Sequence, residues 1–380
     1  MNSLLPYTDE HEIFRTSFAE FLDRECVPYY GDWLKQGYVD KEFYKKMGDN
    51  GFLCIGIDPE YGGLGGDLLY TIIQTEEMNK RGLNCVYTRL HSDVVAPYLE
   101  RLGSEEIKKE YLPKCASGEK ILAVAMSEPE AGSDLAAIAT TATKDGDYYI
   151  LNGSKAFISN GLIADTIVVA ARTSTEDKPH KGISLILLDG DTPGFTRSRL
   201  NKVGLHGQDT SQLFFCNCKV PKSHLLGEEG KGFYHLMDKL QQERLVAAVN
   251  AATMAQYSLD LTLAYVKERQ MYGKRLSDFQ NTQFTLAKLA TEIELARSYN
   301  ESLALEHIKG KKLTKEVSMA KYYSCDLAAR TANACVQFFG GYGLCEDQPI
   351  ALQFVDSRFM PILAGSAEVQ LLIVSRELGL

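Results

Sequence analysis

The sequence lacks the features by which a chain binds nucleic acid or crosses a membrane. Its net charge is −9, and no block of Lys and Arg is long enough to form a basic surface. The short basic run at 309–315 is explained by a solvated loop between helices. No apolar run approaches the length of a membrane span, and Met1–Glu10 has no signal or transit character. We therefore expect a cytoplasmic protein with no membrane span and no nucleic-acid partner.

Paired cysteines and a dinucleotide-binding glycine motif are also missing. The nine cysteines are scattered, and the one close pair, Cys216 and Cys218, has no second pair or His cluster to complete a zinc site. We expect no metal, and free thiols in a reducing compartment. The glycine-rich stretch 59–66 does not lead from a strand into a helix, so it does not indicate a dinucleotide fold. There is no internal repeat and no low-complexity segment.

The composition that remains is that of an ordinary globular protein, with 45% hydrophobic and 24% charged residues, and its patterning changes twice along the chain. Helical spacing of apolar residues prevails up to about 119, including a helix pair around Asp93–Leu102 and Glu105–Ala116. Short β-rich runs separated by turn signals follow, at 120–126, 148–151, 165–170, 182–188 and 212–216. Four long helices close the chain, at about 230–267, 280–309, 314–340 and 348–377.

This order predicts an α+β multidomain protein. Residues 1–119 are expected to form an N-terminal all-α domain, and 120–229 a central antiparallel β-barrel or sandwich, because consecutive strands lack helices between them. Residues 230–380 are expected to form a C-terminal four-helix bundle, since the helices are long and their connections short.

The helix predicted from residue 230 carries a carboxylate on its apolar face. The stripe at helical spacing consists of Phe233, Leu236, Met237, Leu240, Ala247, Ala248, Ala251 and Met254. Glu243 lies in the middle of this stripe, and Arg244 flanks it. A carboxylate that a helix carries inward must be paired, hydrogen-bonded or functional, because desolvating a charge is costly. From this helix alone, a buried Glu243–Arg244 pair that holds two helices in register and a catalytic carboxylate are both open.

Four further segments have residue types that suit a bound cofactor. The segments 126–134 and 155–161 combine small polar side chains, glycine and an aromatic at strand ends, where exposed backbone N–H groups suit a phosphate or a ring edge. In the segment 269–276, a glycine break leaves Arg269 and Arg275 able to hold a pyrophosphate. The glycines of 337–343 allow another molecule to approach a helix end closely.

Seven motifs in order, covering essentially the whole chain, make the sequence similar to the acyl-CoA dehydrogenase family. They are SEPEAGSD from Ser127, KAFISNG from Lys155, QDTSQLFF from Gln208, LLGEEGKGF from Leu225, RQMYGKRL from Arg269, FQNTQF from Phe279 and QFFGGYGL from Gln337. The runs 239–245 and 361–368 resemble the long-chain branch of the family.

The resemblance implies that FAD is held between the β-domain and the bundle. In the β-domain the matching residues are Ala123, Ala125, Met126, Ser127, Gly132, Ser133, Phe157 and Ser159. A neighbouring subunit completes the site through positions that match Arg269, Met271, Tyr272, Gln337 and Gly341, and Ser366 and Glu368 match C-terminal contacts. A shared site of this kind implies a homo-oligomer, most often a homotetramer built as a dimer of dimers.

The resemblance also assigns the catalytic roles, with one departure. Many members carry their base where this chain has Ala364, which accepts no proton, so one interpretation is a dead enzyme. The long-chain and isovaleryl branches take the base from the helix that carries Glu243, which makes Glu243 the expected base here. The Ala364 backbone N–H is then expected to meet the thioester carbonyl, beside Arg244. Ser133, Gln241, Arg244 and Gly365 are the expected substrate contacts.

The implied reaction is the oxidation of an acyl-CoA to a trans-2-enoyl-CoA, with hydride passing to FAD and electrons to an electron-transferring flavoprotein. An acyl-carrier-protein thioester dehydrogenase or a flavin oxidase of the same fold is the alternative, and a catalytically silent binding or assembly protein is the alternative from another class. Asp93 is unexpected in a segment that matches the acyl-tail helix. Either it points to solvent, or the acyl group is polar or shorter.

Overall fold

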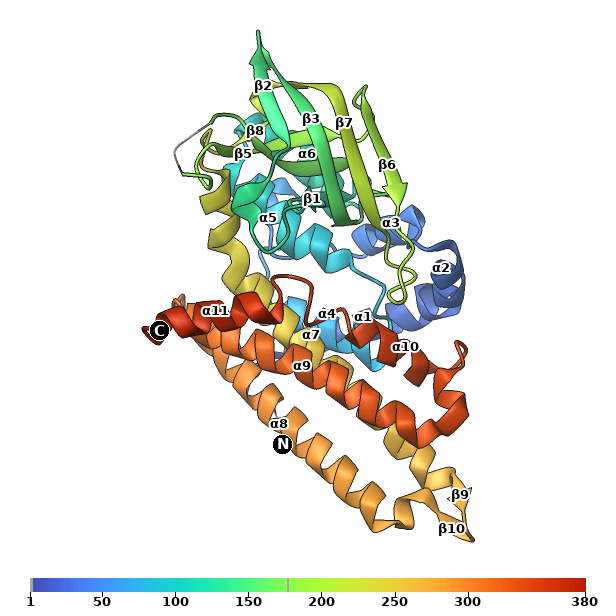
Figure 1. Ribbon diagram of the computed structural model, residues 1–380. Coiled ribbons are helices and arrows are strands. Elements are labelled where there is room, and N and C mark those ends of the chain that lie inside the picture. Colours follow the sequence, from blue (N-terminus) through green and yellow to red (C-terminus); the bar gives the residue numbers. More distant parts are fainter. Residues whose placement is uncertain (1–2, 176–177) are drawn as a thin grey trace.

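The computed structural model describes residues 3–175 and 178–380, without the side chain of Lys239, and it arranges them as helices, sheet and helices in chain order (Figure 1). Met1 and Asn2, which open the predicted first domain, lie outside the described residues. The N-terminal helices are α1 (Asp9–Glu25), α2 (Tyr30–Gln36), α3 (Lys41–Asp49), α4 (Leu68–Lys80), α5 (Ala96–Leu102) and α6 (Glu105–Ala116). A π-helical turn, η3 (Leu90–Val95), runs directly into α5.

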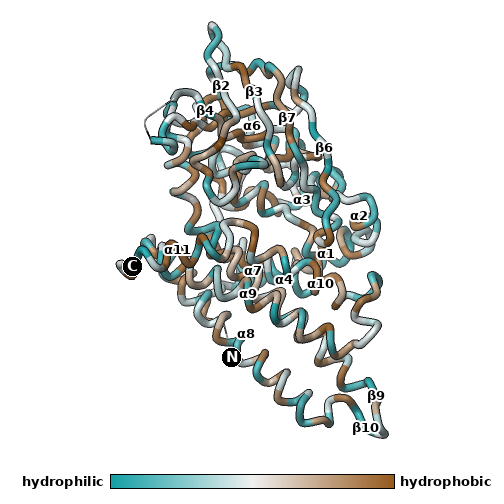
Figure 2. Tube along the Cα trace, in the orientation of Figure 1, coloured by the Kyte–Doolittle hydropathy of each residue, from teal (hydrophilic) through white to brown (hydrophobic). Residues whose placement is uncertain are grey.

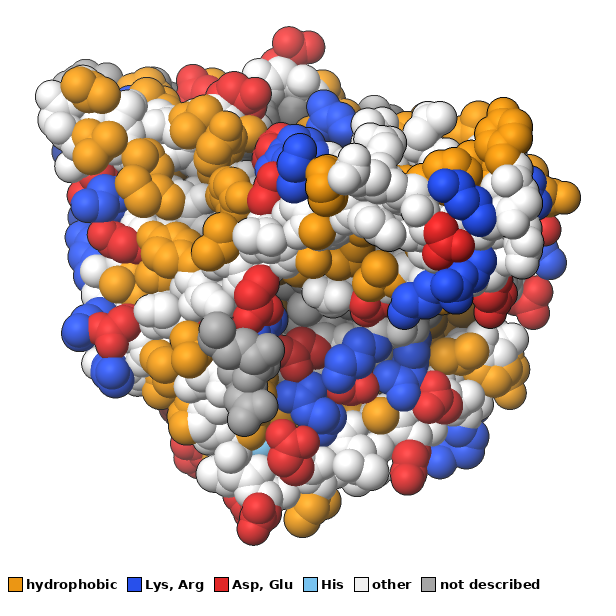
Figure 3. All heavy atoms as spheres, turned by 90° about the horizontal axis from the view of Figure 1, so that it is seen from below, with side chains coloured by type: hydrophobic (Ala, Val, Ile, Leu, Met, Phe, Trp, Pro, Cys, Tyr) orange, Lys and Arg blue, Asp and Glu red, His pale blue; other side chains and the backbone are white. Residues whose placement is uncertain are grey.

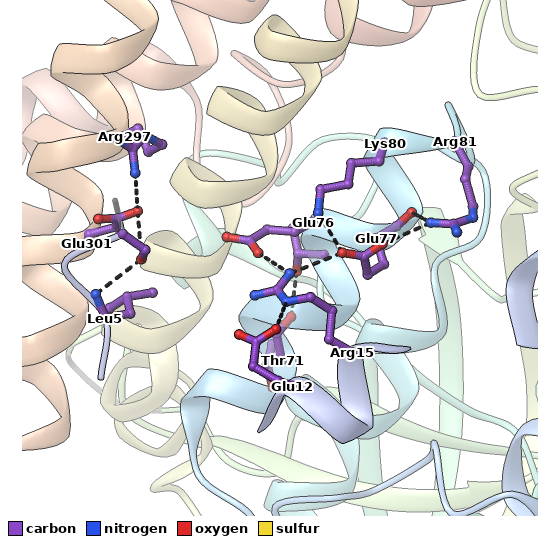
Figure 4. A network of polar contacts seen from close by, with 12 residues as sticks. Leu5, Glu12, Arg15, Thr71, Glu76, Glu77, Lys80, Arg81, Arg297 and Glu301 are labelled. Carbon is purple, nitrogen blue, oxygen red and sulfur yellow. Dashed lines mark hydrogen bonds and ion pairs between the residues drawn. The ribbon is translucent and has the colours of Figure 1, made fainter. Parts of the chain in front are cut away.

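Aromatic packing and a charged network hold the N-terminal helices together. Phe18 and Phe21 of α1 pack edge-on against Phe52 in the buried core. Outside that core, the Arg15 guanidinium of α1 donates to Glu76 at 2.6 Å and to Glu77 at 3.1 Å, both on α4 (Figure 4). The same close-up shows Arg297 and Glu301 of α8, where Glu301 also accepts from the backbone of Leu4. The N-terminal segment is therefore tied to both helical regions.

The central region is a sheet whose strands run in the order β6-β7-β3-β2-β4-β5-β8, with β1 paired to β4. Their bounds are β1 (Leu122–Ala125), β2 (Thr141–Asp145), β3 (Tyr148–Ser159), β4 (Thr166–Arg172), β5 (Ile183–Asp189), β6 (Phe195–Arg199), β7 (Thr210–Pro221) and β8 (Leu225–Leu226). Most pairs are antiparallel as predicted, but β1 and the end of β2 pair with β4 in parallel. The interior-facing residues of β3, β4 and β7 form one apolar cluster.

The C-terminal region contains α7 (Gly232–Glu268), α8 (Gln280–Ile308), α9 (Thr314–Phe339), α10 (Pro349–Ser357) and α11 (Ala367–Glu377). A small hairpin of β9 (Gln270–Met271) and β10 (Lys274–Arg275) joins α7 to the single turn η6 (Leu276–Asp278), which leads into α8. The prediction of one last helix over 348–377 is wrong. Pro361 and the left-handed backbone of Ala364 and Gly365 interrupt it, and Ser366 caps a new helix.

Hydrophobic and hydrophilic residues alternate along these long helices (Figure 2). Within residues 3–175 and 178–380, no helix is long and apolar enough to cross a membrane. The nine cysteines are free thiols, as the sequence predicted.

Candidate active site

Glu243 lies on α7 at the point where that helix passes α5. The Tyr98 hydroxyl of α5 donates to Glu243 Oε1 at 3.3 Å. Tyr98 is buried, and its pKa is raised strongly by burial and further by the Glu243 carboxylate. Glu243 itself is half-buried, so its carboxylate lies at the edge of the interior.

Arg244 follows Glu243 directly on α7. It is buried, and its Nε has no hydrogen-bond partner within the described residues. Burial lowers the Arg244 pKa, and the nearby Glu243 charge opposes this shift. The Glu243 carboxylate therefore favours the charged form of the buried Arg244 guanidinium.

The segment 358–366 lies against α7 and carries Ala364. Asn250 of α7 contacts the Met360 sulfur at 3.5 Å. The buried Lys321 Nζ of α9 donates to the carbonyl oxygens of Met360 at 3.2 Å and Gly365 at 2.7 Å, and the charge of Arg244 lies close enough to help lower the Lys321 pKa, which burial lowers most. Lys321 thus fixes both ends of the Ala364 turn beside Arg244.

Ala364 has a left-handed backbone, with φ of 52°, which is uncommon for a residue with a Cβ. Within the described chain, no acceptor is found for the Ala364 N–H, and the residue is exposed. An exposed, unused N–H held in a fixed turn is suited to receive a carbonyl oxygen from another molecule.

At the end of β1, a buried ion pair fixes the loop that contains most of the predicted β-domain cofactor residues. Lys155 Nζ donates to Glu128 Oε1 at 2.8 Å and to the Met126 carbonyl at 2.9 Å. Glu128 also accepts the backbone N–H groups of Ala139 and Thr140. Burial lowers the Lys155 pKa to about 8, although Glu128 favours its charged form. Glu128 and Lys155 both stand inside motifs of the family resemblance, but neither had a predicted role. The signal that could have found them is a charged residue among β-rich residues.

The residues of this loop that the resemblance selected lie together at the strand ends. Ala123 and Ala125 are fully buried in β1, Met126 and Ser127 are half-buried, and Gly132 and Ser133 are exposed. A Cβ added at Gly132 would meet nothing within 4 Å, so this stretch of backbone is open to a ligand. The Ser127 carbonyl accepts from Ala156 N, which brings Phe157 and Ser159 of β3 to the same place.

Phe157 shows why β3 is irregular here. Its φ is 61°, its side chain is 68% exposed, and the register of β3 against β7 shifts between Lys155 and Ile158. Ser159 accepts a hydrogen bond from Gln208 at 3.0 Å. An exposed aromatic beside small residues and free backbone fits the ring and the pyrophosphate of a flavin dinucleotide, so the β-domain residues fit FAD.

The second set of predicted cofactor residues is not brought to this place within one chain. Arg269, Met271 and Tyr272 belong to the β9–β10 hairpin, which lies at the tip of the helices farthest from the sheet (Figure 1). Tyr272 is 90% exposed, and Gln337 and Gly341 are exposed as well. Within one chain, these residues therefore lie apart from the predicted cofactor residues of the β-domain.

The remaining predicted residues lie elsewhere on the C-terminal helices. Ser366 caps α11 by accepting from Val369 N, and Glu368 is exposed in its first turn. Gln241 contacts the loop between α8 and α9, where it accepts from Leu313 N at 2.7 Å and donates to the Lys311 carbonyl at 2.9 Å. The role of Gln241 in substrate binding stays a prediction. Its side-chain amide already forms hydrogen bonds within the protein. No cluster of metal-ligating side chains is found among the described residues.

Comparisons with known proteins match the whole length of the chain. Family models described as the N-terminal, middle and C-terminal domains of acyl-CoA dehydrogenase match residues 8–119, 123–218 and 230–379. The chain is 41% identical to the long-chain specific acyl-CoA dehydrogenase of Sus scrofa, over 98% of this chain and 87% of that protein.

Two solved structures extend the comparison to the fold. A structure titled as an acyl-CoA dehydrogenase from Geobacillus kaustophilus is 50% identical, covers 100% of both chains and has a TM-score of 0.98. A glutaryl-CoA dehydrogenase from Mycobacterium smegmatis in complex with FADH2 is 27% identical over 98% of this chain and 95% of that chain, with a TM-score of 0.90.

Proposed function

Because the chain belongs to the acyl-CoA dehydrogenase family and is thus an FAD-binding oxidoreductase, we propose that it oxidises an acyl-CoA thioester with Glu243 as the base. The observation that carries this proposal is a half-buried carboxylate on α7, next to Arg244, whose charge reaches the Lys321 amine that holds the Ala364 turn and its unused backbone N–H. The two groups are what removal of a proton next to a carbonyl requires.

In this mechanism Glu243 takes the proton from the carbon next to the thioester carbonyl. The hydrogen bond from Tyr98 orients the carboxylate, and the Ala364 N–H donates to the carbonyl oxygen as negative charge develops there. Ala364, with its small side chain, leaves space for Glu243 to approach. Arg244 keeps a positive charge near the carboxylate.

FAD, when bound, supplies the hydride acceptor for the β-hydrogen. Ser127, Gly132, Ser133, Phe157 and Ser159 would hold it in the β-domain. The positions Arg269, Met271, Tyr272, Gln337 and Gly341 of a neighbouring subunit would complete the site, because they lie at the far tip of their own chain. Ser366 and Glu368 are proposed C-terminal contacts, and Gly365 and Ser133 are proposed substrate contacts.

We infer a homotetramer from the apolar side chains left on the helical surface. The view from below shows hydrophobic side chains gathered on that face (Figure 3). Large exposed apolar residues on the outer helices are Phe284, Leu295 and Ile308 of α8, and Leu371 and Leu372 of α11. Exposed apolar groups at this density favour burial against another subunit.

The proposed electron acceptor is an electron-transferring flavoprotein, since the reduced cofactor must pass its electrons out of the site. Cytoplasmic location is our inference from nine free thiols, which suit a reducing compartment.

The test is anaerobic mixing of the purified holoenzyme with a panel of acyl-CoA thioesters while flavin absorbance is followed. Bleaching of the flavin supports acyl-CoA dehydrogenation. The absence of bleaching with every member of the panel would contradict the proposed function. Rapid reoxidation of the reduced flavin by air would indicate that oxygen, rather than an electron-transferring flavoprotein, is the electron acceptor. Glu243→Gln should slow bleaching by about 10²–10⁴-fold while acyl-CoA still binds. Asp260→Asn, an exposed acid on the same helix, is the matched control and should bleach normally.

A further inference from the structure

An arginine and an aspartate lie in the interior near the proposed base, and the reaction assigns neither a role. Arg89 directly precedes the π-helical turn η3, and Asp93 lies within that turn. The Arg89 side chain is buried and the Asp93 Oδ2 atom is buried. The alternative that Asp93 points to solvent is therefore wrong.

Each of the two side chains has one buried polar atom that forms no hydrogen bond with any residue of the described chain. Arg89 donates to Thr75 at 2.9 Å and to Asn250 at 3.1 Å, but its Nε has no acceptor. Asp93 Oδ2 has no donor, and no Arg89–Asp93 ion pair or hydrogen bond is found among the described residues. They are four residues apart at the η3 turn, and each favours the charged form of the other.

This pair is linked to the same face of α7 that carries Glu243. Asn250, which binds Arg89, follows Glu243 by seven residues on α7, so it lies on the same face and about 10 Å further along the helix. Tyr87 connects the two places, because its ring lies 5.7 Å from the Arg89 guanidinium and its pKa is raised first by burial and also by Glu243. Tyr87, Asp93 and Asn250 are half-buried, so the interior is not closed around them.

We propose that Arg89 and Asp93 form a polar end to the acyl site and select thioesters whose acyl group carries a neutral hydroxyl or carboxamide at its far end. This inference rests on the proposed function, since it concerns the substrate of that site. An oxygen of the acyl group accepts from Arg89 Nε, and its O–H or N–H donates to Asp93 Oδ2.

The chemistry of the pair excludes the other acyl ends. A methyl end at this place would leave a buried donor and a buried acceptor unsatisfied, and each such group costs about 1–3 kcal/mol. A carboxylate would meet the Asp93 charge, and an ammonium group would meet Arg89. A hydroxyl or an amide satisfies both atoms at once, because each contains an acceptor and a donor. Sites built to bind a hydroxyl discriminate strongly against the analogue that lacks it.

The experiment compares acyl-CoA pairs with the same number of non-hydrogen atoms in anaerobic flavin reduction by the intact holoenzyme. The pairs are ω-hydroxypentanoyl against hexanoyl, ω-hydroxyhexanoyl against heptanoyl, and ω-hydroxyoctanoyl against nonanoyl. We expect kcat/KM to favour the hydroxyl at one length by about 10-fold or more. A preference for the alkyl member at every length would overturn the inference while leaving the proposed function intact. No flavin reduction by any member would overturn both.

Variants test whether Arg89 and Asp93 recognise the far end of the acyl group or only stabilise the fold. The double variant Arg89→Leu with Asp93→Leu removes both polar groups together, so neither is left unpaired, and it should reverse the preference toward the alkyl member. Asp93→Asn and Arg89→Met should each reduce the preference, and Asp260→Asn should leave it unchanged. If the double variant folds, binds FAD and keeps the hydroxyl preference of the parent, the pair does not contact the acyl end. If it fails to fold, Asp93→Asn with an unchanged preference has the same meaning.

Discussion

Glu243 and Ala364 are complementary residues on two neighbouring elements. A carboxylate stands on α7, and a residue with almost no side chain stands on the segment that α7 contacts through Asn250 and Met360. In the proposed mechanism, a base on either element could reach a thioester held at the Ala364 N–H, so the reaction would need one carboxylate at this place rather than one specific helix.

We expect that moving the carboxylate, as Glu243→Gly with Ala364→Glu, recovers part of the activity that Glu243→Gly alone loses. Ala364 is exposed, so a longer side chain has room. Recovery should be partial, because a misplacement of about 1 Å costs roughly 100-fold in rate. Stopped-flow reduction of the flavin measures it. A double variant no faster than Glu243→Gly would show that position 364 does not face the same carbon.

Among the elements, the interrupted last helix depends on one buried amine. Lys321→Met keeps the apolar length of the side chain but removes the donor to the Met360 and Gly365 carbonyls. Gly365 retains its bond from Gln370 at 3.1 Å, whereas Met360 loses its partner. We expect the free energy of unfolding to fall by about 1–3 kcal/mol.

Flavin reduction by Lys321→Met should also slow, because the Ala364 N–H is no longer held in place. Urea unfolding and stopped-flow reduction measure the two effects. Lys315→Met, on the same helix and paired at the surface with Glu316, is the control and should change neither. Lowered stability with an unchanged reduction rate would limit Lys321 to a structural role.

The π-helical turn η3 contributes a histidine that joins the helical region to the sheet. His91 Nε2 donates to the Cys115 carbonyl of α6 at 3.0 Å, and its Nδ1 accepts from Leu122 N of β1 at 3.0 Å. Burial lowers the His91 pKa from 6.5 to about 4. The Cys54 and Cys115 thiols beside it stay neutral in this range because burial raises their pKa values, while Asp165 favours the protonated imidazole.

Acidification should therefore destabilise the protein through His91. Between pH 6.5 and about 4 the unfolded chain binds a proton at this residue and the folded chain does not, so stability falls as the pH is lowered. The loss amounts to about 3 kcal/mol across that range. Urea unfolding at several pH values measures the slope, which should be shallower in His91→Gln. Equal slopes in the two proteins would contradict the neutral buried imidazole.

Sequence patterning predicted the long elements and failed where local chemistry interrupts them. Apolar periodicity identified α7, α8 and α9 to within a few residues. It continued the last helix through 358–366, because Pro361 and Gly365 are brief signals inside an otherwise helical stretch. The strands β2 and β6 were missed, since their outward-facing residues are polar.

The candidate active site likewise has a part that the sequence predicts and a part that depends on packing. Glu243 could be selected by its position on an apolar stripe, but the partner of its carboxylate, Tyr98, is 145 residues away in sequence. The burial of Asp93 depends on the packing of α4, η3 and α7 around it, and no local pattern encodes that packing.

At the scale of the whole molecule, the two sets of predicted cofactor residues lie at opposite ends of the molecule (Figure 1). The β-domain set surrounds the end of β1, and the hairpin set projects from the tip of α7 and α8 (Figure 1). The tip is exposed, and Tyr272 there has a left-handed backbone with φ of 51°. An exposed aromatic of this kind is typical of a group that contacts a partner.

The last prediction tests whether one site is shared by two subunits. Arg269→Ala should weaken FAD binding by about 1.5–3 kcal/mol, because it removes a guanidinium from a phosphate, and Lys267→Ala nearby should not. Gly132→Trp should block the β-domain half, since the space beside Gly132 is open in the single chain. In a mixed dimer of the two variants, one site combines two intact halves and the other combines two damaged halves. Dissociating and reassembling the variants together should therefore restore FAD binding that neither variant shows alone, as measured by retained flavin absorbance after gel filtration. If each variant binds poorly and the mixture gains nothing although mixed oligomers form, both halves act on the same chain and the shared site is wrong.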